Sequence, residues 1–265
     1  MSEEGAETPP AGVAGRPRPA AVSMAREPGA ELGIVAEARL PGGAVVDMHC
    51  HSSELSLDSG VRADRLVAQA AARGLAGVCL TEHNALWDAD KAREIGERHG
   101  VAVLPGMEVG STHGHVLVFG LDRYHPELTN IERLREIVVA EGGAMVWAHP
   151  MREGDHQRPS WSAIPDLFEA LEVVNGDHTD HVDGYWATLA EELGVGRTGG
   201  SDAHSLPAVG RVGTGFPEPV PDVETLVRLL RLHRHAPLDF RPGGAHGLPH
   251  MADPPPYTPR RPLTS

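Results

Sequence analysis

The chain contains the stretch Val45-Val46-Asp47-Met48-His49-Cys50-His51, in which two histidines stand two positions apart at the end of an apolar run. The β-branched residues predict a strand, in which positions i and i+2 face the same side. Both imidazoles can then reach one metal ion while Cys50 faces away. We expect Asp47, on the same side, to hold a ligand histidine through its other ring nitrogen. Two surface histidines on an edge strand would give the same pattern, so the motif alone leaves metal binding open.

Short apolar runs and amphipathic stretches alternate along the chain beyond this motif. The apolar runs predict strands at 77–80, 101–104, 115–119, 144–148 and 171–174. The amphipathic stretches predict helices at 62–73, 88–99, 131–141 and 183–193. Strands that alternate with helices indicate parallel βα units and an α/β fold. About seven such units between residues 42 and 236 favour a closed barrel over an open sheet.

The two ends of the chain differ in composition from the middle. Residues 1–41 are rich in Pro, Ala, Gly and Glu, and residues 237–265 are rich in proline. Such segments bury too little apolar surface to offset the entropy lost on ordering. We therefore expect a disordered N-terminal segment at 1–41, a barrel domain at 42–236 and a proline-rich tail at 237–265.

Charge and cysteine content restrict the classes of partner and compartment. The 265-residue chain has a formal net charge of -14, so it repels nucleic-acid backbones, and we expect no stable nucleic-acid complex. Its two cysteines, Cys50 and Cys79, do not indicate a disulfide framework. No apolar run approaches the roughly 20 residues of a membrane span, so we expect no membrane partner. These features predict a cytoplasmic protein and leave its oligomeric state open.

Histidine and carboxylate side chains collect where the predicted strands end. His83 follows the second predicted strand, Glu108 the third and His149 the fifth. Asp202 and His204 repeat the i, i+2 spacing of the first motif. Each residue alone has a structural explanation, but active sites of α/β barrels lie at the C-terminal strand ends. Histidines scattered over a surface would not collect there.

Two further candidates depart from this pattern. His115 begins a predicted strand instead of ending one, which suggests a hairpin opposite Glu108. Asp58 lies in a serine-rich loop, where an aspartate also commonly caps a turn.

Taken in order, the motifs resemble the PHP (polymerase and histidinol phosphatase) superfamily. The resemblance covers about residues 44–216 and rests on Asp47-x-His49-x-His51-Ser52, Thr81-Glu82-His83-Asn84, Gly106-x-Glu108, Gly114-His115-Val116-Leu117, Ala148-His149-Pro150 and Ser201-Asp202-Ala203-His204. It implies a distorted (β/α)7 TIM-like barrel with a metal site at the C-terminal strand ends. It also implies a cluster of two or three divalent ions of Zn, Mn or Fe. Matched residue by residue, the ligand positions are His49, His51, Asp58, His83, Glu108, His115, His149, Asp202 and His204.

The chain departs from the family pattern at two places. The second motif usually has aspartate where this chain has Glu82, which we interpret as a residue that binds no metal. The segment Leu57-Asp58-Ser59-Gly60 replaces the Ser-Asp-Gly of many members and follows a slightly longer loop. The second departure makes the assignment of Asp58 depend on how that loop folds.

The resemblance implies a metal-dependent phosphoesterase that hydrolyses a small phosphate ester or short nucleotide through a metal-activated water. Glu108 and Asp202 would be catalytic through the ions that they share. Arg152, just after His149-Pro150, would bind the phosphate of a small phosphorylated substrate as a forked donor, although a surface arginine explains its position equally well. Two alternatives remain open, a metal hydrolase of a non-phosphate bond and a metal-bound module without catalytic activity.

Overall fold

The computed structural model describes residues 43–150, 152, 159–178 and 180–241. The N-terminal segment expected at 1–41 and the part of the expected tail from residue 242 onward lie outside the described residues, so both stay predictions.

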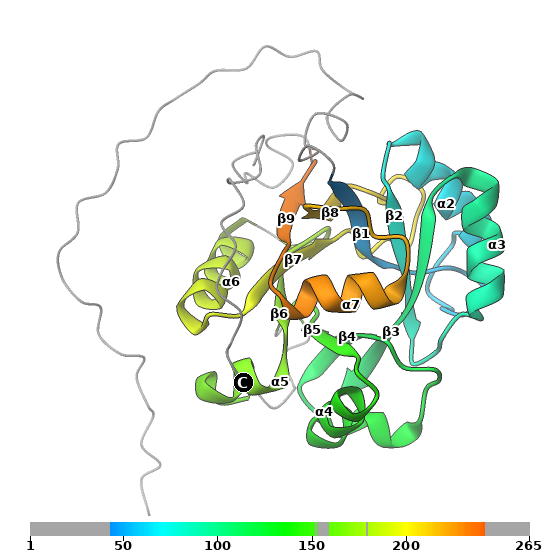
Figure 1. Cartoon of the computed structure of the whole chain (residues 1–265). Helices are drawn as coiled ribbons and strands as arrows, with labels where there is room; N and C mark the ends of the chain where they lie inside the picture. Colours follow the sequence, from blue (N-terminus) through cyan, green and yellow to red (C-terminus); the bar gives the residue numbers. More distant parts are fainter. Residues whose placement is uncertain (1–42, 151, 153–158, 179, 242–265) are drawn as a thin grey trace, which may run out of the picture. The chain divides into compact units, whose positions relative to one another are not determined.

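The described residues form one nine-stranded sheet with the order β7-β6-β5-β4-β3-β2-β1-β8-β9 (Figure 1). Its strands are β1 (Ala44–Cys50), β2 (Gly77–His83), β3 (Ala102–Ser111), β4 (Gly114–Phe119), β5 (Ala144–Trp147), β6 (Ala170–Asn175), β7 (Gly196–Gly200), β8 (Val212–Phe216) and β9 (Ala236–Asp239). β1, β2 and β3 pair in parallel, as do β5, β6 and β7. The antiparallel hairpin of β3 and β4 confirms the one expected opposite Glu108, which pairs with Leu117.

The sheet curves until β7 returns to β1 and β8. The Gly199 amide donates to Oγ1 of Thr214 at 2.9 Å, and just beyond β7 a parallel bridge joins Ala203 to Cys50. The sheet is therefore a nearly closed barrel, which confirms the α/β barrel class. Its nine strands include antiparallel pairs, so the expected count of seven βα units is not confirmed.

Helices with one apolar face cover the outside of the sheet. The helices are α2 (Ala63–Ala72), α3 (Ala89–His99), α4 (Ile131–Ala140), α5 (Ile164–Leu167), α6 (Asp180–Leu193) and α7 (Val223–Arg231), with the 3-10 turns η1 (Pro126–Thr129) and η2 (Trp161–Ala163). Asp88, Asn130 and Asp222 cap three of them by accepting an amide hydrogen bond from the first turn. No helix in the described ranges is long and apolar enough to cross a membrane.

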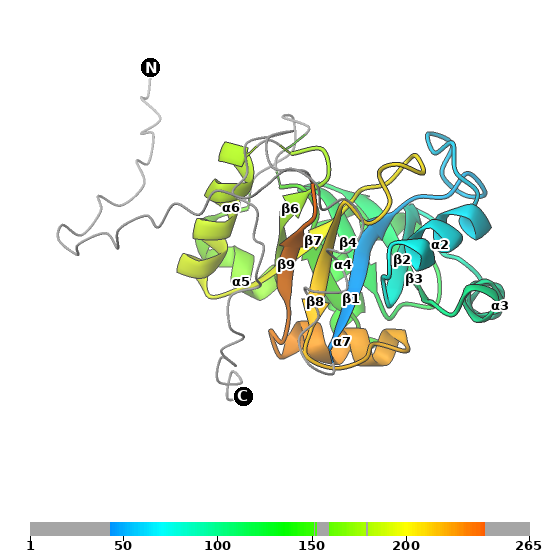
Figure 2. The ribbon, with the colours of Figure 1, turned by 90° about the horizontal axis from the view of Figure 1, so that it is seen from above.

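The apolar core has an inner and an outer part. Inside the barrel, Met48 and Phe119 pack together with Leu229 of α7, which lies across one end of the strands (Figure 2). Outside it, Leu66 of α2 and Ile95 of α3 pack against β1 and β2. α7 therefore closes the inner core at one end, which leaves the opposite end for polar side chains.

The boundary expected between the barrel and the tail was wrong. Residues 237–239 belong to β9, which pairs antiparallel with β8. Two positions later, the buried guanidinium of Arg241 bonds to Asp239 and Asp183 at 2.7 and 2.9 Å. The β9 segment is short and contains a proline, so its pattern does not predict a strand; pairing with β8 decides its structure.

Candidate metal centre

The strand β1 contains one residue more than its partner β2 over the same length. Asp47 pairs with Val78 and Cys50 pairs with Leu80, so three steps along β1 match two steps along β2. Such a bulge bends a strand and changes the direction of the side chains that follow it.

This bulge turns both histidines of the first motif into the barrel. Met48 packs in the inner core, whereas Cys50 packs outside against α2. In a regular strand these two residues would face the same side. The reversal between them places His49 and His51 on the inner side, where both are fully buried.

The bulge also makes the expectation for Asp47 wrong. Among the described residues, no histidine ring bonds to Asp47. Asp47 accepts hydrogen bonds from the amides of Ser201 and Gly210 at 2.9 and 2.8 Å, and from the Ser201 hydroxyl at 2.5 Å. It also accepts a hydrogen bond from the backbone amide of His49 at 3.4 Å, so it joins β1 to the segment after β7 that carries Asp202.

Four buried atoms converge at the centre of the site. Nε2 of His49 lies 3.4 Å from both Oε2 of Glu108 and Oδ1 of Asp202. Nε2 of His51 lies 3.2 and 3.3 Å from the same two oxygens. We call these residues the central quartet. None of the four atoms has a hydrogen-bond partner among the described residues.

The spacing of the central quartet fits a metal ion. Bonds of about 2.0–2.2 Å to histidine nitrogen and carboxylate oxygen give tetrahedral edges of about 3.4 Å. Buried polar atoms without partners are rare because each costs free energy. A cation would satisfy all four atoms at once, so these residues fit the ion that the motifs imply.

Two further groups share residues with the central quartet or adjoin it. In the second group, Oε1 of Glu108 lies 2.8 Å from Nδ1 of His115 and 2.9 Å from Nε2 of His149. In the third group, Oδ2 of Asp58 lies 3.0 Å from Nε2 of His83 and 3.4 Å from Nε2 of His204. Oε1 of Glu108 faces the second group, whereas Oε2 faces the quartet and also lies 3.0 Å from Nδ1 of His83. Glu108 is therefore placed to bridge two ions.

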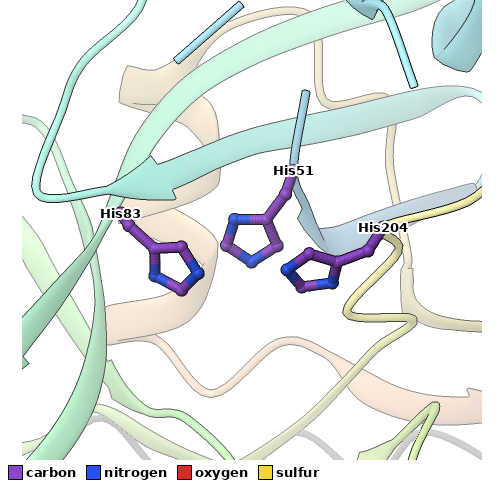
Figure 3. Close-up of side chains that lie close together, drawn as sticks. All are labelled: His51, His83 and His204. Carbon is purple, nitrogen blue, oxygen red and sulfur yellow. The ribbon is translucent and has the colours of Figure 1, made fainter. Parts of the chain in front are cut away.

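The third group lies at the more exposed side of the site. The rings of His83 and His204 both stack against His51, with centroids 4.4 and 4.3 Å from its own and 6.1 Å from each other, and the three rings converge (Figure 3). The side chain of Asp58 is about half exposed. The structure thus brings all of the expected ligand residues together, including Asp58 in spite of its longer loop.

Two expected ligands have unusual backbone conformations. His149 and Asp202 have positive φ angles of 24° and 53°, a region that costs non-glycine residues free energy. Each lies two residues beyond the end of a strand, His149 after β5 and Asp202 after β7. Strain of this kind is concentrated at functional sites.

The carboxylates of the central quartet retain negative charge in spite of burial. Burial raises the pKa of Glu108, but charge on His49 and hydrogen bonds from His115 and His149 hold it well below its usual range. Burial raises the pKa of Asp202, and His49 with Arg152 lowers it well below its usual range. Both carboxylates are therefore deprotonated in the folded chain and could act as oxygen ligands.

Two residues of the site were missed by the sequence analysis. Oε1 of Glu172 lies 3.0 Å from Nδ1 of His49, and Oε2 accepts the His149 amide at 2.9 Å. The Asn175 side chain donates to Glu172 at 2.9 Å. The strand pattern around Glu172 offered one signal, a charged residue in an otherwise apolar run.

Glu82 lies near the site, but its carboxylate oxygens already accept hydrogen bonds from neighbouring residues. It accepts hydrogen bonds from the amide and hydroxyl of Ser52, the hydroxyl of Ser56 at 2.6 Å and the indole of Trp87 at 2.7 Å. It does not belong to the converging groups found among the described residues. Its contacts anchor the loop that carries Asp58.

Arg152 lies beside the site with its guanidinium half-buried. It donates to Oδ2 of Asp202 at 2.6 Å and to Oδ1 of Asn175 at 3.3 Å. It also lies 3.0 Å from Nε2 of His149. These contacts place a forked cation at the rim of an anionic cluster, next to the second group.

The residues around the site lie in stretches of the chain that match known protein families. The profile of the PHP domain matches residues 47–195, and that of a PHP-associated region matches residues 187–234. An error-prone DNA polymerase of Cutibacterium acnes is 29% identical over 44% of this chain and 11% of its own length. A phosphoribosyl 1,2-cyclic phosphate 1,2-diphosphodiesterase of Eggerthella lenta is 32% identical over 32% of this chain and 34% of its own. The matched part thus spans about a tenth of the length of the first relative and about a third of the length of the second.

A solved structure has a similar fold. A two-domain protein of Bacteroides vulgatus, containing a predicted PHP-like metal-dependent phosphoesterase, aligns with a TM-score of 0.58. The alignment covers 76% of this chain and 66% of that one at 19% identity, which shows the fold alone.

Proposed function

Because the chain belongs to the PHP-domain family, we propose that it is a metal-dependent phosphoesterase acting on a small phosphate ester or short nucleotide. The observation that carries the proposal is the central quartet, whose four buried atoms have no hydrogen-bond partner among the described residues. Hydrolysis would use two or three divalent ions of Zn, Mn or Fe, held by the quartet and the two adjoining groups.

The charge of the site supports phosphate as the substrate class. Its ligand carboxylates are Asp58, Glu108 and Asp202, and three divalent ions would outweigh their charge. A loaded site would attract a phosphate dianion in spite of the acidic surface of the chain. When bound, the ions would lower the pKa of water towards neutrality and neutralise charge on the phosphate.

The side chains of this chain would supply orientation. Glu172 holds His49 through Nδ1, so that Nε2 is the nitrogen that would bind an ion in the central quartet. Glu108 keeps the quartet and the second group at a fixed separation by offering one oxygen to each. Arg152 would bind a phosphate oxygen through its forked donors.

The test is a substrate panel combined with elemental analysis of protein purified without chelators. The panel would contain phosphomonoesters, cyclic and linear phosphodiesters and short oligonucleotides, each with Mn²⁺ or Zn²⁺ added. We expect two or three transition-metal ions per chain and turnover of at least one phosphoester. One ion or none, even after reloading, would contradict a multinuclear site. Bound ions without phosphoester turnover would favour another bond or a non-catalytic module.

A further inference from the structure

Arg152 contacts an atom that the second group would need for an ion. Its Nη2 lies 3.0 Å from Nε2 of His149, while its Nη1 lies 2.6 Å from Oδ2 of Asp202. The side chain of Arg152 is 30% exposed, so its outer part borders solvent. Arg152 can therefore break its contact with His149 while its charged group stays next to solvent.

Nε2 of His149 cannot serve all of its neighbours together. It lies 2.9 Å from Oε1 of Glu108 as well as 3.0 Å from Arg152. A ring nitrogen that carries a proton donates, and one without a proton accepts. A protonated Nε2 could donate to Glu108 but not accept from Arg152, and an unprotonated Nε2 could only accept. Metal coordination uses the same lone pair that Arg152 uses.

The carboxylate of Asp202 has no such conflict. Its Oδ1 faces the central quartet, whereas its Oδ2 receives the hydrogen bond from Arg152. Arg152 can therefore remain paired with Asp202 when the quartet holds an ion. Competition between Arg152 and an ion is confined to His149.

We propose that Arg152 and an ion in the second group exclude each other at Nε2 of His149. The inference rests on the proposed function and adds a coupling to it. Loading the second group frees Nη2 of Arg152, while Nη1 keeps its bond to Asp202. The freed donor then lies beside the ions, available to a phosphate oxygen. Phosphate capture by Arg152 thus becomes linked to metal loading.

The experiment titrates the full-length chain with Mn²⁺ and follows free Mn²⁺ by its EPR signal, which gives stepwise dissociation constants without an activity assay. Arg152→Ala removes both the charge and the contact. Arg152→Lys keeps the charge, but its single ammonium cannot reproduce the fork that holds Asp202 and His149 together. Arg62→Ala is the matched control, because Arg62 is an exposed arginine paired with Glu54.

We expect both Arg152 variants to bind the second ion about tenfold or more tightly than the parent chain, because a charged hydrogen bond no longer competes for His149. Arg62→Ala should leave every step unchanged. Tighter binding in Arg152→Ala with parent-like binding in Arg152→Lys would show a charge effect only and overturn the proposal. Unchanged binding in both would also overturn it, leaving the proposed function intact. A parent chain that binds no Mn²⁺ would overturn both.

Discussion

Oε1 of Glu172 lies 3.0 Å from Nδ1 of His49, and both side chains are fully buried. The carboxylate accepts a hydrogen bond from this ring nitrogen, so Nδ1 carries a proton and Nε2 is the ring nitrogen directed at Glu108 and Asp202. The role that the first motif suggested for Asp47 thus belongs to a residue of β6, which pairs with β7, the strand that returns to β1.

Replacing Glu172 should weaken metal binding without removing a ligand. In Glu172→Gln an amide replaces the carboxylate that both His49 and the His149 amide use, so the orientation of both ligands is weakened. Loss of such a partner lowers metal affinity about 10–100-fold, which a Mn²⁺ titration would measure. Glu169→Gln is the control, because Glu169 bonds to Arg135 and the Met145 amide instead. Parent-like affinity in Glu172→Gln would refute the orienting role.

Neutralising a shared carboxylate should abolish most turnover while the fold survives. Glu108→Gln and Asp202→Asn each remove a negative charge and an oxygen ligand, and misplaced ions no longer align water with the phosphate. We expect at least about a hundredfold lower kcat on any substrate that the panel identifies.

His113→Ala is the internal control for these variants. His113 is close in sequence to His115, but its side chain is in none of the converging groups among the described residues. The loss should stay below about tenfold. If His113→Ala abolished turnover and His115→Ala did not, the choice of ligand in this hairpin would be wrong.

Arg241 should be essential for stability, although it lies in the segment expected to be a tail. It is buried against Asp183 and Asp239, and it bonds to the carbonyl oxygens of Asn175 and His178. Arg241→Met would leave two buried carboxylates without this partner, at a cost of about 3–5 kcal/mol. Urea denaturation would measure the loss. Arg228→Met, which removes an exposed pair with Glu218, should cost much less stability than Arg241→Met.

The two end segments, residues 1–42 and 242–265, should be dispensable for folding. A chain shortened to residues 43–241 keeps every described strand and helix as well as Arg241. Its unfolding transition should match that of the full chain. A lower midpoint in urea, or insolubility, would mean that an end segment packs on the barrel.

His235 should make the protein less stable in mild acid. Burial lowers its pKa from 6.5 to about 4. Between these values the unfolded chain binds more protons at this position than the folded chain, so stability falls as pH falls. The contribution from pH 7 to pH 5 is about 2 kcal/mol.

The matched variant is His235→Asn, whose amide can still donate to the Arg197 carbonyl as Nδ1 of His235 does. Unfolding free energies at the two pH values would be compared between the variant and the parent. The parent should lose more stability than the variant on acidification. An equal loss in both would assign the acid sensitivity to other groups.

Local patterns were sufficient to predict most of the ligand set. His49, Glu108 and Asp202 stand in short motifs at the ends of strands, and the geometry of an α/β barrel brings such ends together. The expected helices also matched within a few residues, because their apolar faces and capping residues are local signals. α7 and the strands beside it were not predicted at all.

Features that depend on pairing could not be predicted from local patterns. The bulge in β1 is defined by its register with β2, and it reversed the direction expected for Asp47. Glu172 of β6 bonds to His49, 123 positions earlier in the chain, so sequence spacing gave no indication of the contact. β9 became a strand only through its partner β8.

The bridge between Cys50 and Ala203 joins residues that are made early and late in synthesis, which constrains the order in which the chain folds. During synthesis, β1 leaves the ribosome long before the segment after β7 exists, and the Ser201 amide that Asp47 binds lies 154 positions downstream. Contacts of such separation are slow to form because a long loop must close first. The newborn chain therefore carries His49 and His51 without Asp202 and must remain unaggregated until its last third has been made. The central quartet is consequently complete only after Asp202 has been made, late in the synthesis of the chain.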